Sequence, residues 1–234
     1  NGIVYKSLAG VQQLQKCKMT LAVAKSCGPG RPKDLEKRAA ILAAAKRLFP
    51  LSGFEGTSMD AIAAEAGVSK LTVYSHFTDK ETLFIAAIRA RCQDQVPDVL
   101  FDVDTGGPVR GQLEAIARAF LGLVTSPDAI SLHRLLTASG SASPKLAQLF
   151  WEAGPLRMRQ SFEEFLRQEV RVGQLDIPDT TRAASQFFAL LKGELHARLL
   201  CGCGQSLSAQ DVEEHVAATV DFFLRAYTPR AANA

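Results

Sequence analysis

The chain has 234 residues, 47% of them hydrophobic and 22% charged, which excludes a mainly disordered protein and fits one large domain or a small domain followed by a larger one. Its net charge of +3 is unevenly placed, at +4 over residues 1–30, +3 over residues 31–91 and −4 over residues 92–234. The basic N-terminal third indicates contact with a polyanion, and the acidic remainder indicates a different task.

Several classes of protein are excluded by what the chain lacks. Its longest apolar runs are too short to span a membrane and its N-terminus has no signal-peptide core, so we expect a cytoplasmic protein that does not contact membranes. The five cysteines show no Cys/His metal spacing, so they predict reduced thiols and no metal or other cofactor. Residues 1–30 are expected to be a basic arm that is disordered or foreign to the native fold, because Met19 is the first methionine.

Nearly every segment shows the apolar spacing of a helix, and no alternating run is long enough for a strand, so the sequence predicts an all-α fold. The first helix is expected from about Leu35 to Phe49, with Pro50 and Gly53 ending it. A second helix follows GTSMD, residues 56–60, where a hydroxyl at position 57 or 58 suits the free amides of the helix start.

The stretch GVSKLTVYSHF, residues 67–77, predicts a short third helix after a three-residue turn. So short a connection makes the second and third helices cross steeply. Only Val68, Val73 and Phe77 anchor the third helix, so stability alone does not explain its polar outer face. Within a basic three-helix core this pattern is typical of a helix-turn-helix, whose second helix enters the DNA major groove. A fourth helix is expected to start at Thr78–Glu81, which has capping-box spacing, and to reach Arg91.

The run from residue 41 to residue 84 resembles the N-terminal domain of the TetR (tetracycline-repressor) family. The shared pattern is A-x-x-L-F, then G-F/Y-x-x-T-S/T, I-A-x-x-A-G-V-S and T-x-Y-x-H/Y-F-x-x-K-E-x-L. Two positions depart from it: Pro50 stands where the family more often has a helix former, and Leu71 where a small or polar residue is frequent. The resemblance implies a homodimer that binds a double-stranded DNA operator, and Leu71 is expected to affect base preference.

The resemblance also assigns DNA contacts residue by residue. Base-edge or groove contacts fall on Lys70, Leu71, Thr72 and Ser75, phosphate contacts on Thr57, Ser58, Tyr74, His76 and Lys80, and Ser69 joins the DNA-binding set. The alternative for the third helix is a packing helix with a solvated polar face, and for His76 a partly buried structural imidazole. Ahead of the first helix, the extended segment GPGRPK is expected to place Arg31 in a narrow minor groove, with Lys33 beside it. The alternative is a mobile basic linker that adds salt-sensitive affinity.

Beyond about Leu113 the chain changes to long apolar helices. These are expected over residues 112–124, 128–139, 145–175 with an interruption at Gly154 and Pro155, 180–202 and 207–227. The segments FWEAGP, FLRQEVRVGQL and FFALLKGELHARLL resemble the effector domain of the AefR-like branch of the same family. The resulting division is 1–30 for the arm, 31–83 for the helix-turn-helix domain and 84–234 for a helical effector-binding and dimerisation domain, with Gly106 and Gly107 in the connecting loop.

This resemblance implies an apolar ligand cavity among the middle helices and dimerisation through the last two. Candidate pocket residues are Phe120, His133, Phe150, Trp151, Met158, Phe162 and Phe187, with His133, Arg157 and Gln160 as polar groups that orient a small hydrophobic effector. Candidate dimer contacts are Phe188, Leu191, Leu195, Leu199, Val220, Phe223 and Leu224. For both sets the alternative is plain core packing.

The leading functional hypothesis is a homodimeric repressor that a small apolar ligand releases from a palindromic operator. An enzyme is disfavoured because the chain shows no paired carboxylates, no Ser/His/Asp grouping and no phosphate-binding loop. Two alternatives are a DNA-binding protein without an effector and a redox-responsive regulator that uses Cys201 and Cys203. A free thiol is usually inert without a cationic partner, and Arg198 is the candidate for that partner.

Overall fold

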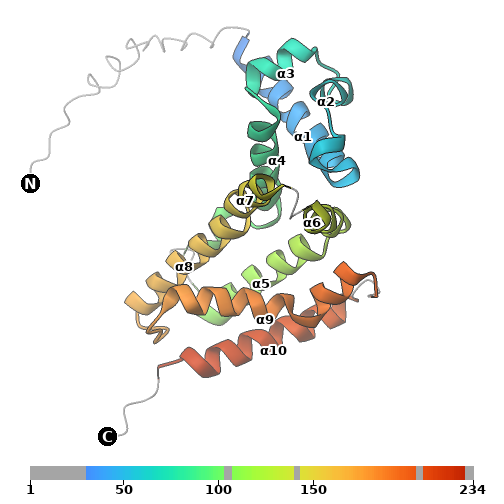
Figure 1. Ribbon diagram of the computed structural model, residues 1–234. Coiled ribbons are helices and arrows are strands. Elements are labelled where there is room, and N and C mark those ends of the chain that lie inside the picture. The colour runs from blue at the N-terminus through green and yellow to red at the C-terminus, as the bar shows by residue number, and fades with distance from the viewer. Residues whose placement is uncertain (1–29, 103–106, 140–142, 204–207, 230–234) are drawn as a thin grey trace, which may run out of the picture. The chain divides into compact units, whose positions relative to one another are not determined.

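The computed structural model of the chain describes residues 30–102, 107–139, 143–203 and 208–229, which contain helices and no strand (Figure 1). The α-helices are α1 (Gly30–Gly56), α2 (Met59–Glu65), α3 (Lys70–His76), α4 (Lys80–Gln95), α5 (Val109–Thr125), α6 (Pro127–Ser139), α7 (Pro144–Ala153), α8 (Pro155–Arg171), α9 (Thr180–Cys201) and α10 (Ala209–Tyr227), with a 3-10 turn, η1 (Asp98–Phe101), after α4. The all-α prediction is confirmed. The chain divides at Leu35 into two compact units, and the packing below is that of residues 36–234.

Helix α1 is longer than predicted at both ends. It begins at Gly30, so the segment expected to be extended is helical from that residue on; Pro32 fits because the first turn of a helix does not use its amide hydrogens. Pro50 lies inside the helix and does not end it. The break comes at Gly53, whose φ of 70° is accessible to glycine without strain.

Helices α1 to α4 enclose a first hydrophobic core, to which α6 and α7 also contribute buried residues. Phe49, Phe84 and Phe77 are almost fully buried in it, and the Phe49 and Phe84 rings meet edge to face with centroids 5.0 Å apart. The start of α4 differs from the expected capping box, because Asp79 and not Thr78 caps the helix, accepting a 2.6 Å hydrogen bond from the Thr82 amide. That hydrogen bond lowers the pKa of the Asp79 carboxyl, which remains ionised at the positive end of the helix.

A second core lies among α5, α8, α9 and α10, around stacked phenylalanine rings such as Phe162 and Phe187. Figure 1 shows α9 and α10 running side by side, with α4 reaching from α3 toward α7. Cys92 of α4 packs against both cores, so this helix belongs to both. The domain division predicted after residue 83 falls inside α4, whose Leu83 and Phe84 are buried in the first core; the division stays a prediction.

In the described part of the chain, no single helix is long and apolar enough to cross a bilayer. Val109–Thr125 and Pro127–Ala138 meet the length and composition requirement only jointly, as a pair bent by 60°.

Glu169 is an unusual core residue, since its side chain is fully buried and neither carboxyl oxygen has a hydrogen-bond partner. Burial raises the pKa of this carboxyl, so the folded state holds the proton more tightly than the unfolded chain does. Stability is therefore lost as pH rises from the unfolded pKa through the folded one. We expect Glu169→Met to raise the free energy of unfolding by about 1–3 kcal/mol at neutral pH and by less in acid, measured by urea unfolding near pH 5 and near pH 8.

Glu164, on the same helix, provides a matched control. It is exposed and pairs with Arg167 at 3.1 Å and Arg171 at 3.0 Å, which lowers the pKa of its carboxyl. Glu164→Met should therefore lose stability at neutral pH relative to acid, the opposite sign. Equal pH dependence in the two variants would contradict this account of Glu169.

Candidate DNA-binding surface and effector pocket

The turn between α2 and α3 is built from three residues with separate tasks. Gly67 closes α2 in the left-handed conformation, with φ 65°. Ser69 caps α3 by accepting a 3.1 Å hydrogen bond from the Thr72 amide. Val73 is fully buried and Phe77 is 2% exposed, so α3 is held from one side only. The predicted helix-turn-helix geometry is present.

The outer face of α3 presents apolar, aromatic and cationic groups together. Leu71 is 80% exposed and Tyr74 is 44% exposed, although both are large side chains that folding usually covers. Lys70 lies beside them, and its ammonium pairs with Asp60 of α2 at 2.9 Å, which raises its pKa. In a major groove, such side chains can make apolar contacts with thymine methyl groups and donate hydrogen bonds to guanine.

The hydroxyl groups on this face are partly engaged within the helix. The Ser69 and Thr72 oxygens lie 2.8 Å apart, and the Ser75 hydroxyl donates to the Thr72 carbonyl at 2.7 Å. Ser58 is exposed and caps α2 through the Ala61 amide at 3.0 Å. Their oxygen atoms can still accept further hydrogen bonds, and their assignment as DNA contacts remains a prediction.

Of the predicted phosphate contacts, Thr57 is corrected because its side chain is buried, and Lys80 stays a prediction, although its ammonium has a partner within the chain. The Thr57 side chain is buried, and its hydroxyl donates to the Gly53 carbonyl at 2.7 Å, which secures the chain after the break in α1. The Lys80 ammonium donates to the Phe54 carbonyl at 2.8 Å and lies 4.4 Å from the centre of the Phe54 ring. Both side chains therefore hold the end of α1, Thr57 from within and Lys80 from the start of α4.

His76 is half-buried, with its ring centroid 6.5 Å from that of Phe77, which favours the structural alternative over a phosphate contact. Arg31 and Lys33 belong to the first turns of α1 by their backbone, while the placement of their side chains lies outside the described part of the chain.

The contact of Lys80 with the end of α1 gives a measurable expectation. Lys80→Met should destabilise the protein by about 1–2 kcal/mol, because it removes a hydrogen bond to a carbonyl and a cation–π contact, and should leave the salt dependence of DNA binding unchanged. Lys70→Ala should instead relax base preference at a cost of about 1–3 kcal/mol. Urea unfolding measures the stability, and fluorescence anisotropy with operator variants, from about 50 to 200 mM salt, measures base preference and the salt dependence of binding. A salt slope reduced by about one unit in Lys80→Met, with stability intact, would assign Lys80 to the phosphate contacts.

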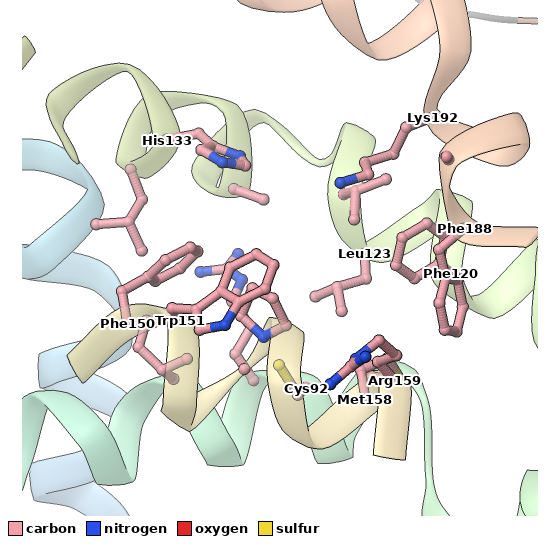
Figure 2. Close-up of a pocket in the computed structure, with 18 of the residues that line it drawn as sticks. Cys92, Phe120, Leu123, His133, Phe150, Trp151, Met158, Arg159, Phe188 and Lys192 are labelled. Atoms are coloured by element: carbon pink, nitrogen blue, oxygen red, sulfur yellow. The ribbon is translucent and has the colours of Figure 1, made fainter. Parts of the chain in front are cut away.

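A pocket with a volume of about 230 Å³ lies in the middle of the helical body, lined by residues of α4, α5, α6, α7, α8 and α9 (Figure 2). Phe120 and Phe188 stand on one side of it, with ring centroids 4.4 Å apart, and Phe150 and Trp151 stand on the other. Trp151 is 51% exposed while it lines the pocket. This is the largely apolar cavity with a few polar groups that a small ligand requires.

The structure places five of the predicted pocket residues in this lining: Phe120, His133, Phe150, Trp151 and Met158. The prediction is wrong for Phe162 and Phe187, which are fully buried in the second core and stack on each other at 4.6 Å. Arg157 and Gln160, expected to orient a ligand, also lie outside the lining, and Arg159 takes that place. Helical spacing alone does not determine how α8 is rotated about its axis, so the predicted lining residues of this helix were displaced by one or two positions.

The main contribution missed from the sequence is that of α4. Ile88, Arg91 and Cys92 line the pocket, although none of them was among the predicted pocket residues. From α9 the lining takes Lys192 and Phe188, the second of which was assigned to the dimer interface. The sequence feature that could have indicated this role is the apolar spacing in α4, which continues beyond the part of the helix that packs against α1–α3.

Burial shifts the pKa values of titratable groups at the pocket and beside it. The pKa of His133 is lowered by desolvation and by the charge of Lys192, and the pKa of His196, whose ring lies 5.3 Å from that of His133, falls to about 4. Both imidazoles are therefore neutral at physiological pH. Burial raises the pKa of the Cys92 thiol to about 11, which makes it a poor nucleophile.

The predicted dimer contacts divide into two groups. Leu191, Val220 and Phe223 are fully or almost fully buried within the chain, so their assignment to an interface is corrected to core packing. Leu195, Leu199 and Leu224 are half-buried and remain candidates. The exposed apolar residues on the last two helices are others: Leu190 of α9, 39% exposed, and Phe222 of α10, 62% exposed.

Cys201 and Cys203 are exposed free thiols at the end of α9. Arg198, the expected cationic partner, instead lies 3.5 Å from the Glu194 carboxylate. This pairing does not favour thiolate activation, and a redox role stays a prediction.

Comparison with known proteins agrees with this geometry. Residues 41–87 match the model of "Bacterial regulatory proteins, tetR family", and residues 111–229 match that of the "AefR-like transcriptional repressor, C-terminal domain". The chain is 34% identical over 93 residues to the HTH-type transcriptional activator FasR of Mycolicibacterium smegmatis, covering 40% of this chain and 42% of that protein. It is 29% identical over 165 residues to the HTH-type transcriptional regulator SrpR of Pseudomonas putida, covering 70% and 76%.

Solved structures show the same architecture. A regulator assigned to the TetR family from Mesorhizobium loti superposes with a TM-score of 0.70 at 31% identity, covering 84% of this chain and 99% of its own. The Flavonoid-responsive Regulator FrrA superposes with a TM-score of 0.64 at 34% identity, covering 83% and 98%. With a helix-turn-helix matching one family model and a helical body matching the other, the chain belongs to the TetR family and is a DNA-binding transcriptional regulator, not an enzyme.

Proposed function

We propose that the protein is a homodimeric repressor that binds a palindromic operator and is released from it by a small, largely apolar ligand. The observation that carries this proposal is the position of α4. Its first turns are buried in the core of the DNA-binding head, through Leu83 and Phe84, and its later turns line the pocket, through Ile88, Arg91 and Cys92. A ligand that shifts α4 therefore acts directly on the packing beneath α3.

Arg91 provides a polar connection along the same route. Its guanidinium lines the pocket, pairs with Asp128 of α6 at 2.6 Å and donates to the Lys46 carbonyl of α1 at 3.4 Å. That carbonyl is available because the residue four positions later is Pro50, which has no amide hydrogen to donate. One side chain thus joins the pocket wall to main chain of the DNA-binding head.

The junction between α7 and α8 packs closely on α4. A methyl group added at Gly154 would lie 3.2 Å from the Ile88 side chain and 3.5 Å from the Cys92 sulfur. Packing this close leaves little room for α7 and α8 to move without α4, which favours discrete rearrangement over gradual deformation.

Dimerisation is proposed through the exposed apolar face of α9 and α10, centred on Leu190 and Phe222. A second copy of the chain is the partner that fits, because a two-fold axis through this face brings the same patch against itself. A dimer also doubles the site that one short recognition helix can read, and it requires an operator with matching two-fold symmetry.

The relatives bear on the effector and on the direction of control. The name of FrrA records a response to flavonoids, which are small aromatic molecules, and a family model matching the helical body is named for a repressor. FasR is named an activator. To release a repressor, a ligand must prefer the conformation in which the two DNA-binding heads of the dimer are not spaced to fit the operator. A hundredfold preference for that conformation corresponds to about 2.7 kcal/mol of coupling.

The experiment that tests the proposal combines footprinting with reciprocal titration. The purified protein is bound to DNA from upstream of its own gene, and compounds that raise its melting temperature are added. We expect a two-fold symmetric footprint, and we expect such compounds to lower operator affinity by the same factor by which operator DNA lowers theirs. A reporter fused to the operator should rise in expression with the compound. A panel that stabilises the protein without changing DNA affinity would support the effector-free alternative instead.

A further inference from the structure

The pocket wall has an uneven charge. Among the described residues that line it, Arg91, Arg159 and Lys192 are basic and none is an aspartate or glutamate. Figure 2 shows Lys192 and Arg159 reaching the pocket from different helices, α9 and α8, around the same apolar space. A cavity that bound only neutral, apolar molecules would have no use for such an excess of positive charge.

The three cations differ in whether the protein neutralises them. Arg91 is paired with Asp128 at 2.6 Å. Arg159 and Lys192 form neither an ion pair nor a hydrogen bond with any of the described residues, and the Nε atom of Arg159 is buried with no acceptor for its proton. A buried donor left unsatisfied costs stability, and the cost is larger when the group is charged. An anion in the pocket would supply the acceptor that the buried Arg159 Nε lacks and a counter-charge for the half-buried Lys192.

We propose that the pocket binds a small aromatic acid, whose ionised carboxylate is held by Arg159 and Lys192; this rests on the proposed function of the pocket as the effector site. A guanidinium binds a carboxylate through charge-assisted, often paired hydrogen bonds, and Lys192 adds a second positive charge. The aromatic body of the ligand lies between the Phe120 and Phe188 pair and the Phe150 and Trp151 pair.

His133 adds orientation without further charge. Its ring lies 5.6 Å from that of Phe150, and burial, together with the neighbouring Lys192 charge, lowers its pKa. A neutral imidazole offers one donor and one acceptor to a second polar group on the ligand. The volume of about 230 Å³ is close to the lower end of the range of about 300–1,000 Å³ that is usual for small-molecule sites, which suits a compact ligand of one or two rings.

Calorimetry with a matched set of probes tests the proposal. Cinnamate, cinnamamide and cinnamylammonium share one aromatic body and differ in charge, and octanoate keeps the acid on an aliphatic body. On the wild-type protein we expect cinnamate to bind at least tenfold more tightly than cinnamamide, a difference of about 1.4 kcal/mol, and the ammonium compound to bind least. This comparison needs no variant and so does not depend on the folding of one.

Arg159→Met should then lose at least tenfold in cinnamate affinity and keep its affinity for cinnamamide, and Lys192→Met should change in the same direction. Arg157→Met is the control, because Arg157 is on the same helix, lies 3.8 Å from Asp98 and does not line the pocket. Trp151, the single tryptophan of the chain, reports binding independently through its fluorescence.

Several results would overturn the inference. These are a neutral amide that binds as tightly as the acid, equal losses in Arg159→Met and Arg157→Met, no binding of any acid, or octanoate binding more tightly than cinnamate. Operator DNA separates this inference from the proposed function. An acid that binds through Arg159 and leaves DNA affinity unchanged would keep the inference and overturn ligand release; release by the neutral amide alone would do the reverse.

Discussion

Phe222→Glu is expected to convert the protein to a monomer and to abolish operator binding. The side chain is 62% exposed on α10, and a two-fold axis through the α9 and α10 face would bury it twice, once in each copy. Each copy would then place an unpaired carboxylate in an apolar interface, at a cost of about 3–5 kcal/mol per site. We expect the dissociation constant of the dimer to rise by more than about a hundredfold, measured by sedimentation at micromolar protein.

The control for this variant is Val172→Glu. Val172 follows α8 and is 60% exposed, so it is an apolar residue with a similar exposed fraction that does not belong to α9 or α10. It should remain dimeric and should footprint like the wild-type protein. If Phe222→Glu sediments as a dimer and protects the same operator, the interface lies elsewhere on the protein.

Arg91→Met should weaken the communication between the pocket and the DNA. Methionine keeps an apolar, flexible side chain in the pocket wall but removes both the ion pair to Asp128 and the hydrogen bond to the Lys46 carbonyl. For a compound that releases the wild-type protein from DNA, we expect the change in operator affinity to shrink by at least about tenfold, or about 1.4 kcal/mol of coupling. Anisotropy titrations of operator DNA with and without the compound measure it.

Lys46→Met is the matched control, because it removes the 2.6 Å ion pair between Lys46 and Asp94 but keeps the main-chain carbonyl that Arg91 contacts. This variant should couple as the wild-type protein does. Unchanged coupling in Arg91→Met, or an equal loss in Lys46→Met, would show that communication does not pass through the Arg91 guanidinium.

The sequence predicted the fold well because helical spacing and turn chemistry act locally. The α2 and α3 pair could be placed to within a residue or two, since Gly67 and Ser69 define the turn through their own backbone and side-chain requirements. The errors occurred at helix ends. Pro50 was expected to end the first helix and the segment around Pro32 to be extended, yet a proline is tolerated in the first turn, and at Pro50 another donor reaches the freed carbonyl.

The pocket was predictable by region but not by residue. Phe150, Trp151 and Met158 line it as expected, whereas Phe162, one turn beyond Met158, faces the core. The periodicity of apolar residues identifies the apolar stripe of a helix, but it does not show which part of that stripe lines a cavity. Arg159 was missed for the same reason, since an arginine on an amphipathic helix is usually solvated, and only the packing of α4 and α9 around it shows that its Nε atom is buried.

The proline inside α1 has a consequence for how such a regulator is adjusted. Arg91 contacts the DNA-binding head through a hydrogen bond to a main-chain carbonyl, so this hydrogen bond does not depend on which side chain stands at position 46. What opens that carbonyl is a single missing amide hydrogen at position 50. Under the proposed function, exchanging Pro50 for a helix former would supply a competing amide donor to the Lys46 carbonyl, and we expect the coupling between the pocket and the DNA to weaken although the exchange changes no residue of the pocket lining or of α3.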